Sequence, residues 1–175
     1  MMSETKLHVS ITEELDKNNN RWFLENLVRI LATGEETEGR FFLGEVYAAP
    51  GDEPPLHLHE NEEEGLYIIE GQMTVWSGEE APRVLNAGEF VLLPRGIAHT
   101  YKVTSPTETR YLAITTPAGF EGFVRGISVP AEKLTLPQEL PEPTPEQMQA
   151  MQEVAKQHGI QLLGPPGARP ADLNK

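Results

Sequence analysis

Apolar and polar residues alternate in several short runs through the middle of the chain. The first run, Arg40 to Ala49 (RFFLGEVYAA), ends at Pro50 and Gly51. Because alternation with a period of two buries one face of an extended chain, each run predicts a β-strand. Further runs, separated by turn residues, lie at 65–70, 72–76, 90–93, 99–103 and 111–115. Short strands at near-regular spacing predict an all-β sandwich or barrel.

The two ends of the chain are less regular than this middle part. Residues 1–20 are polar and predict a lead-in or an edge element, and the stretch 22–30 (WFLENLVRI) is compatible with a strand or a short helix. After Pro117, residues 118–135 predict a lid or a further edge segment. From Gly164 onward the chain is rich in proline and glycine, which predicts a tail without regular structure.

One helix is expected near the C-terminus, after the proline-rich arm 136–145. Thr144 is a suitable N-cap, Pro145 follows at the first helical position, and Gln147 completes a capping box. These signals predict a short helix over 145–158 with Gly159 as its stop.

The patterns together predict one domain in three parts. We expect an N-terminal segment with a possible edge strand over 1–36, a barrel core over 37–117, and a C-terminal extension over 118–175 that contains a lid segment, the arm and the helix. A length of 175 residues suits a single domain of this kind.

Composition and charge narrow the function classes. The net charge of -13 argues against a nucleic-acid partner, because phosphate binding needs a basic face. No apolar stretch approaches the length of a membrane helix and the first residues lack a leader pattern, so we expect a cytoplasmic protein without membrane contact. The chain has no cysteine, which excludes disulfides and thiolate metal sites.

Three of the five histidines predict a metal site. His57 and His59 would share one face of a strand, roughly 6.6 Å apart along the chain, and His99 follows forty residues later on another predicted strand. Neutral imidazoles together with a carboxylate from the acidic run between them suit Fe, Mn, Ni, Cu, Co or Zn. We therefore expect one divalent transition metal per chain.

The spacing of these residues resembles the two motifs of the cupin superfamily. The first motif, a glycine, His-x-His, a glutamate and a glycine, is met by Gly51, His57, His59, Glu64 and Gly71. The second motif, Gly, Pro-x-Gly and His, is met by residues 88–99, although Val103 stands where asparagine is usual. The resemblance implies a cupin-type jelly-roll β-barrel (a double-stranded β-helix). It also implies a set of four metal ligands: His57, His59, Glu64 and His99.

The acidic run 60–64 leaves a choice of carboxylate. The spacing from His59 permits Glu63 or Glu64, and the six-residue spacing to Gly71 selects Glu64. Strand alternation also turns Glu64 inward and Glu63 toward water. We expect the remaining glutamates, Glu60 and Glu62 with Glu63, to lie in a solvated loop. Gly71, between two extended runs, predicts a hairpin turn with a positive φ.

A closer resemblance covers PPLHLHENEEEGLYIIEG, PRGIAHTYKV and the C-terminal HGIQLLGPP. These segments resemble bacterial single-domain cupins related to quercetin 2,3-dioxygenase. The resemblance implies ring-opening dioxygenation of a flavonol-like or other enolic or aromatic small molecule by O2, with release of carbon monoxide. It further implies that Glu64 doubles as metal ligand and catalytic base. The alternatives are another metal-cupin enzyme (isomerase, decarboxylase or hydrolase) or a non-catalytic protein that binds a metal or a small molecule.

The inward positions near the histidines predict an apolar, aromatic pocket. Alternation selects as its candidates Met73, Val75, Phe90, Leu92, Tyr101 and Val103. Phe120 and Phe123 follow the last predicted strand, where they would either close over a flat substrate or pack a lid or dimer interface. For a substrate pocket we select Met73, Tyr101, Phe120 and Phe123. Because an open sheet edge favours pairing, we also expect a homodimer.

Overall fold

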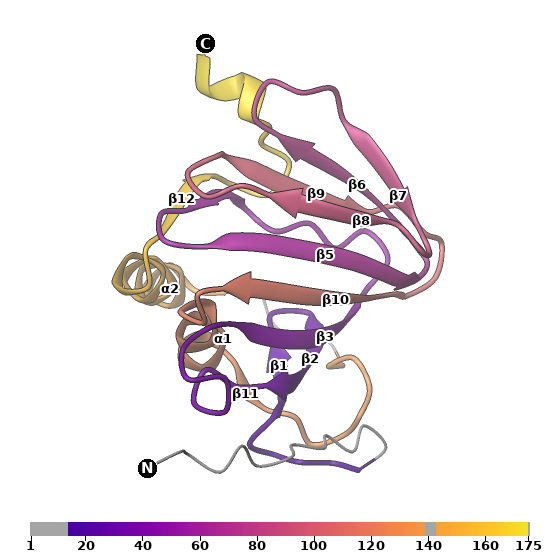
Figure 1. Ribbon diagram of the computed structural model, residues 1–175, viewed down its shortest axis with the longest axis vertical. Helices are drawn as coiled ribbons and strands as arrows, with labels where there is room; N and C mark the ends of the chain where they lie inside the picture. The colour runs from indigo at the N-terminus through magenta and orange to yellow at the C-terminus, as the bar shows by residue number, and fades with distance from the viewer. Residues whose placement is uncertain (1–13, 139–142, 175) are drawn as a thin grey trace, which may run out of the picture.

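Two antiparallel sheets form the body of the protein, in a computed structural model that describes residues 14–138 and 143–174 (Figure 1). The larger sheet has seven strands, in the spatial order β11 (Val129–Pro130), β1 (Asn20–Phe23), β2 (Asn26–Ala32), β3 (Phe42–Ala48), β10 (Thr109–Thr116), β5 (Glu63–Glu70) and β8 (Phe90–Leu93). The smaller sheet has five, in the order β12 (Ile160–Gly164), β4 (Leu56–His59), β9 (His99–Val103), β6 (Gln72–Ser77) and β7 (Arg83–Asn86). This arrangement confirms the all-β jelly-roll prediction.

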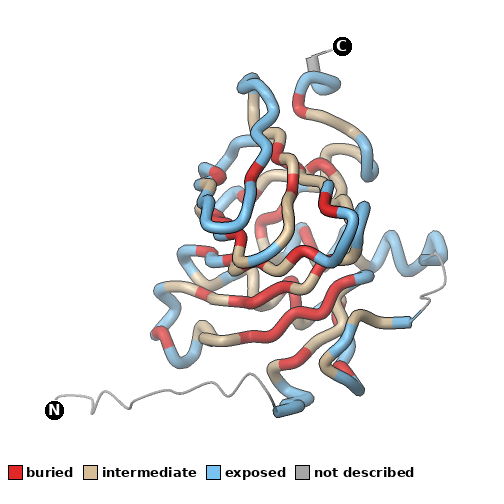
Figure 2. The backbone as a smooth tube through the Cα atoms, turned by 90° about the vertical axis from the view of Figure 1, so that its right-hand side faces the viewer, coloured by how far each residue is buried: buried red, intermediate tan, exposed pale blue. Residues whose placement is uncertain are grey.

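The core lies between the two sheets, where the inward residues of each strand meet. Phe42, Leu66, Ile68, Met73 and Val103 are each at most 2% exposed. Figure 2 shows these buried stretches along the strands, with exposed residues concentrated in the connections. The period-two alternation seen in the sequence therefore marks the face that is removed from water.

Two helices lie next to each other at one end of the sheets (Figure 1). The first, α1 (Phe120–Ile127), occupies the segment predicted as a lid, and β11 after it forms an edge strand beside β1. The second, α2 (Pro145–Gln157), confirms the predicted helix. Its capping box is present, because the Gln147 amide donates to Thr144 Oγ1 and the Thr144 amide donates to Gln147 Oε1.

Several predicted strands match closely, and others differ for identifiable reasons. The runs 90–93 and 99–103 coincide with β8 and β9. The stretch 22–30 spans two strands, β1 and β2, because Leu24 adopts a φ of 54° and reverses the chain. Since β2 pairs with β3, the larger sheet includes part of the N-terminal segment that was predicted over 1–36. Residues 1–13 of that segment lie outside the described part of the chain.

The turn at Gly71 differs from its prediction. Its φ of 89° confirms the left-handed conformation, and a side chain there would lie within 2.4 Å of Thr109 Oγ1. However, β5 and β6 do not pair with each other in a hairpin. Gly71 instead carries the chain from the larger sheet to the smaller one.

The C-terminal tail is also more ordered than predicted. β12 pairs with β4, and a 3-10 helix spans Pro170–Asn174. The Arg169 guanidinium lies 3.8 Å from the centre of the Trp76 ring and forms an ion pair with Glu53. These contacts hold a proline- and glycine-rich segment whose composition alone indicates no regular structure. In the described residues, no helix is both long enough and apolar enough to cross a membrane.

Candidate metal centre

Three strands bring the histidines and Glu64 together. β4 and β9 are neighbours in the smaller sheet, where His57 lies directly opposite His99. His59, two residues along β4, points to the same side as His57. Glu64 comes from β5 in the larger sheet, so the cluster joins the two sheets across the interior.

The geometry of the cluster matches a set of ligands for one ion. One ligand atom from each of His57, His59, Glu64 and His99 can be chosen so that all four lie within 4.8 Å of one another. The imidazole of His57 lies 4.5 Å from that of His99 and 5.3 Å from that of His59, measured between ring centres. The sequence-predicted residues thus converge on a common point.

Backbone carbonyls fix the orientation of two of the rings. His57 Nδ1 lies 2.8 Å from the Pro55 carbonyl oxygen, and His99 Nδ1 lies 2.9 Å from that of Ile97. Because a carbonyl only accepts hydrogen bonds, Nδ1 carries the proton in both residues. The Nε2 of His57 therefore keeps its lone pair, which is the form that binds a metal. The Nε2 of His99 lies 3.2 Å from Glu64 Oε2, a contact that a bound ion would replace.

His59 is oriented by a buried carboxylate instead. Its Nδ1 lies 3.2 Å from Glu62 Oε2, and the other oxygen of Glu62 accepts the Phe120 amide at 2.6 Å. Glu62 is only 3% exposed, so its prediction as a solvated loop residue is wrong. Its carboxylate is buried because it binds both a ring nitrogen and the first backbone N–H of α1.

Glu60 and Glu64 lie as predicted, whereas Glu63 begins β5 and does not lie in a loop. Glu64 is turned inward, whereas Glu63 is partly exposed and pairs with Arg95 at 3.0 Å, and Glu60 is exposed. Burial acts to raise the pKa of Glu64, but the hydrogen bond from His99 and the neighbouring imidazoles lower it to about 2. Glu64 is therefore ionised near neutral pH, as a metal ligand must be.

Two further properties of the histidines suit a cation at this point. Burial, with a contribution from His99, lowers the pKa of His57 to about 3, so its ring is neutral under ordinary conditions. His59 Nε2 is buried and has no hydrogen-bond partner among the described residues. A buried acceptor without a partner is costly, and an ion bound by the three imidazoles and Glu64 would satisfy it.

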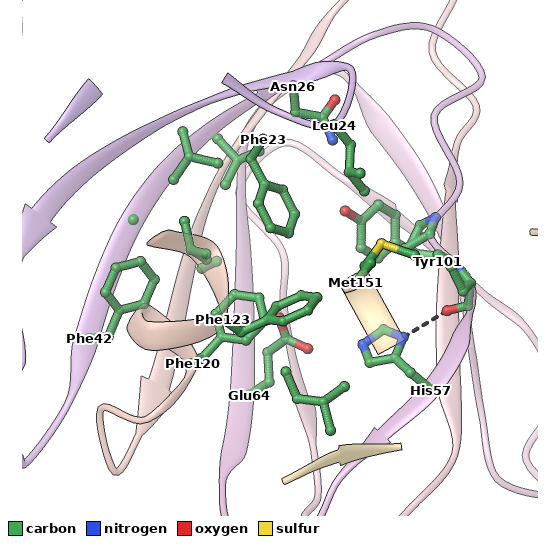
Figure 3. A pocket seen from close by; sticks show the side chains of 18 of the residues that line it. Phe23, Leu24, Asn26, Phe42, His57, Glu64, Tyr101, Phe120, Phe123 and Met151 are labelled. Atoms are coloured by element: carbon green, nitrogen blue, oxygen red, sulfur yellow. Dashed lines mark hydrogen bonds between the residues drawn. The ribbon is translucent and has the colours of Figure 1, made fainter. Parts of the chain in front are cut away.

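A cavity that is partly open to solvent adjoins His57 and Glu64 (Figure 3). Tyr101, Phe120 and Phe123 line it, as expected of a substrate pocket. Met73 does not line it, because its side chain is fully buried in the core between the sheets. The walls are mostly apolar and include residues from β1, β2, β3, both helices and β12: Phe23, Val28, Phe42, Val124, Met151 and Leu162.

The prediction that Phe90 and Leu92 face the pocket is wrong. Both are 56% exposed, and it is Leu93 of the same strand that is buried. β8 has apolar residues at four successive positions, so the pattern does not reveal which alternate pair is inward. Val75 and Val103 are buried in the core without lining the cavity.

Fold and site together define the class of protein: a jelly-roll barrel with an internal cluster of three imidazoles and a carboxylate that could bind a metal. Residues 44–115 match the model of the cupin domain family. A solved structure described as a predicted oxalate decarboxylase from Thermotoga maritima superposes with a TM-score of 0.56 at 19% identity, over 62% of this chain and 98% of the other. That likeness supports the fold alone.

Among proteins of known activity, this chain resembles the quercetin 2,3-dioxygenases. The enzyme of Bacillus subtilis (strain 168) is 35% identical over 109 residues, which cover 62% of this chain and 32% of that protein. The enzyme of Aspergillus japonicus is 31% identical over 101 residues, 54% of this chain and 29% of that protein. The matched region is about a third of the length of these two relatives.

Proposed function

We propose that this protein is a metal-dependent dioxygenase that acts on a flavonol-like or other enolic aromatic small molecule. The observation that carries the proposal is the position of the His57, His59, Glu64 and His99 cluster, which adjoins a largely apolar cavity. The similarity to two quercetin 2,3-dioxygenases supports the choice of reaction. The substrates would be the organic molecule and O2.

The three histidines and Glu64 are the residues that would hold the ion. When bound, a transition metal supplies Lewis acidity toward an enol or hydroxyl oxygen and, if redox-active, electrons for the reaction with O2. Glu64, ionised near neutral pH, would accept the proton that such a hydroxyl releases. One carboxylate would then serve as ligand and as general base, without a separate base.

The wall of the cavity would orient a flat substrate. Phe120 lies 5.2 Å from the His59 ring and 5.8 Å from Phe123, measured between ring centres. Aromatic side chains so close to the ligand cluster would pack against a planar ring and exclude water from the reacting atoms. No lysine or arginine lines the cavity in the described residues, which disfavours phosphorylated substrates.

Oxygen uptake tests the proposal directly. Purified protein, loaded separately with each first-row divalent metal, is mixed with quercetin and related enols, and O2 consumption and carbon monoxide release are recorded. We expect O2 uptake with at least one metal and none after chelation. The absence of uptake with every loaded metal would rule out the dioxygenase and favour a non-oxidative cupin enzyme or a binding protein.

The homodimer and the cytoplasmic location stay predictions. Light scattering at micromolar concentration should give the mass of two chains, because short sheet edges are commonly covered by pairing. A mass of one chain under these conditions would contradict the homodimer.

A further inference from the structure

The turn between β1 and β2 places one exposed apolar side chain at the cavity. Phe23 pairs with Asn26, so Leu24 and Glu25 form a two-residue hairpin loop. Leu24 lines the cavity, and Figure 3 shows its side chain pointing from the turn into it. Leu24 is also 37% exposed, whereas the other described residues that line the cavity are buried or half-buried. A side chain that faces both the cavity and solvent lies at the mouth of the cavity.

The backbone of Leu24 adopts a conformation that leucine disfavours. Its φ of 54° lies in the left-handed region, where the Cβ of an L-residue crowds the following carbonyl oxygen. Glycine is the usual residue where a two-residue hairpin needs such a φ. In the described part of the chain, Leu24 and Glu38 are the non-glycine residues with a positive φ. Backbone strain concentrates at functional sites, and of these two residues Leu24 is the one that lines the cavity.

Contacts on both flanks hold the turn in this strained position. Phe23 packs edge-to-face on Phe123 of α1, with ring centres 5.8 Å apart. On the other flank, Asn26 is 3% exposed and its Nδ2 donates to Asp52 Oδ2 at 3.0 Å. Because these contacts join the turn to α1 and to the segment before β4, the turn cannot relax without losing one of them. The turn is therefore a rigid support for the side chain of Leu24.

We propose that Leu24 covers the mouth of the cavity over a bound aromatic ligand and slows its dissociation. Other half-buried apolar residues also belong to the cavity wall: Pro54, Pro55, Met151 and Leu162. Glycine at position 24 would relieve the backbone strain but would leave the edge of a bound ring in water, whereas leucine removes that apolar surface from water. The inference rests on the proposed function for the nature of the ligand, but it does not depend on the reaction with O2.

The dissociation rate of an aromatic ligand tests the inference. Zinc-loaded protein is mixed with 3-hydroxyflavone in the absence of O2, and association and dissociation rates are measured by stopped-flow fluorescence. We expect dissociation to be about tenfold faster in Leu24→Gly and in Leu24→Asn, because both residues tolerate a positive φ but neither covers the mouth with apolar surface. Leu24→Met keeps a long apolar side chain and should stay within about threefold of the native rate.

Thermal unfolding separates this role from a merely structural one. Leu24→Gly should melt within about 4 °C of the native protein, because the relief of strain offsets the lost contacts of the side chain. Glu38→Gly is the matched control, since Glu38 also has a positive φ but is exposed and does not line the cavity. This variant should release the ligand at the native rate.

Native dissociation rates in both Leu24→Gly and Leu24→Asn would overturn the inference and leave the dioxygenase proposal standing. A tenfold increase in Leu24→Met or in Glu38→Gly would also overturn it, because the effect would then not come from the apolar cover. If the native protein does not bind 3-hydroxyflavone, the flavonol-like substrate class fails, and the inference fails with it.

Discussion

At the scale of single residues, the cluster is organised by hydrogen bonds to the Nδ1 atom of each ring. Carbonyl oxygens hold His57 and His99, and a carboxylate holds His59. With each Nδ1 fixed, the three Nε2 atoms are left to face Glu64. The arrangement is preorganised, so a bound ion would not have to reorient its ligands.

Glu64→Gln tests the double role of this residue. The amide can still offer an oxygen to a metal, but it cannot accept a proton, so we expect kcat/KM to fall by about 100-fold or more. Metal content, measured by mass spectrometry, should fall much less. Glu63→Gln is the matched control and should leave both nearly unchanged, since Glu63 faces Arg95. A larger loss of activity in Glu63→Gln would show that the wrong carboxylate was chosen.

Glu62→Gln tests the support of His59. The amide keeps the size of the side chain but loses the charge that orients and polarises the ring, so metal affinity should drop by about 10- to 100-fold. Competition with a chelator measures this change. Glu60→Gln, at an exposed position, should bind metal as the native protein does. Equal affinities of the two variants would mean that Glu62 does not support the site.

These residues also show what sequence can and cannot reveal about the site. The spacing of His57, His59 and His99 and the alternation around Glu64 are local signals, so the sequence predicted their convergence. Glu62 was missed because its burial depends on the Phe120 amide, 58 positions away along the chain.

At the scale of elements, the C-terminal part completes the pocket. β12 extends the smaller sheet beside β4, where Leu162 pairs with His57 and Ile160 with His59. Phe123 of α1, Ala155 of α2 and Ile160 form a small apolar cluster of their own. The helices are therefore packed against β12, the neighbour of the strand that carries two of the histidines, and they form part of the cavity wall.

Phe123→Ala tests this packing. Phe123 is 7% exposed, and removing its ring should lower the free energy of unfolding by about 3 kcal/mol, since a buried phenylalanine leaves a cavity. Denaturant titration gives the value. Phe90→Ala is the matched control: its side chain is 56% exposed, so the change should stay within about 1 kcal/mol. Equal losses in both variants would contradict the assigned packing.

Element prediction succeeded where the signal was local and failed where it was not. The capping box around Thr144 marks the start of α2, and the predicted runs mark β3, β5, β6, β8, β9 and β10. β12 was missed because, in the described part of the chain, it pairs only with β4, about a hundred residues earlier. The inward and outward residues of β8 were predicted the wrong way round, because a strand with apolar residues on both sides shows no alternation.

At the scale of the whole molecule, the cluster depends on the closure of the barrel. Glu64 comes from one sheet and the histidines from the other, so the set exists only when both sheets pack around the common core. Folding and the metal site are therefore linked, and an ion that binds the folded chain alone stabilises it.

Acidification should release the ion. Burial lowers the pKa of His59, but the hydrogen bond to Glu62 and the charge of Glu64 outweigh burial, and the net shift is upward. The pKa of His57 is about 3, so His59 is the first of the two to be protonated as the pH falls. Dialysis at about pH 4 should therefore remove the metal, and return to about pH 7.5 with metal should restore it. Full retention at about pH 4 would contradict ligation by imidazole.

The most direct test of the account is a comparison of metal content between the native protein and two variants, His59→Ala and His158→Ala. Each protein is loaded with metal, and excess ion is removed before the measurement. His158 lies outside the ligand cluster. The account predicts one ion per chain in the native protein and in His158→Ala, and a strong loss in His59→Ala, with nitrogen-rich coordination in X-ray absorption. Native protein that takes up no ion, or a His59→Ala variant that binds as the native protein does, would contradict it.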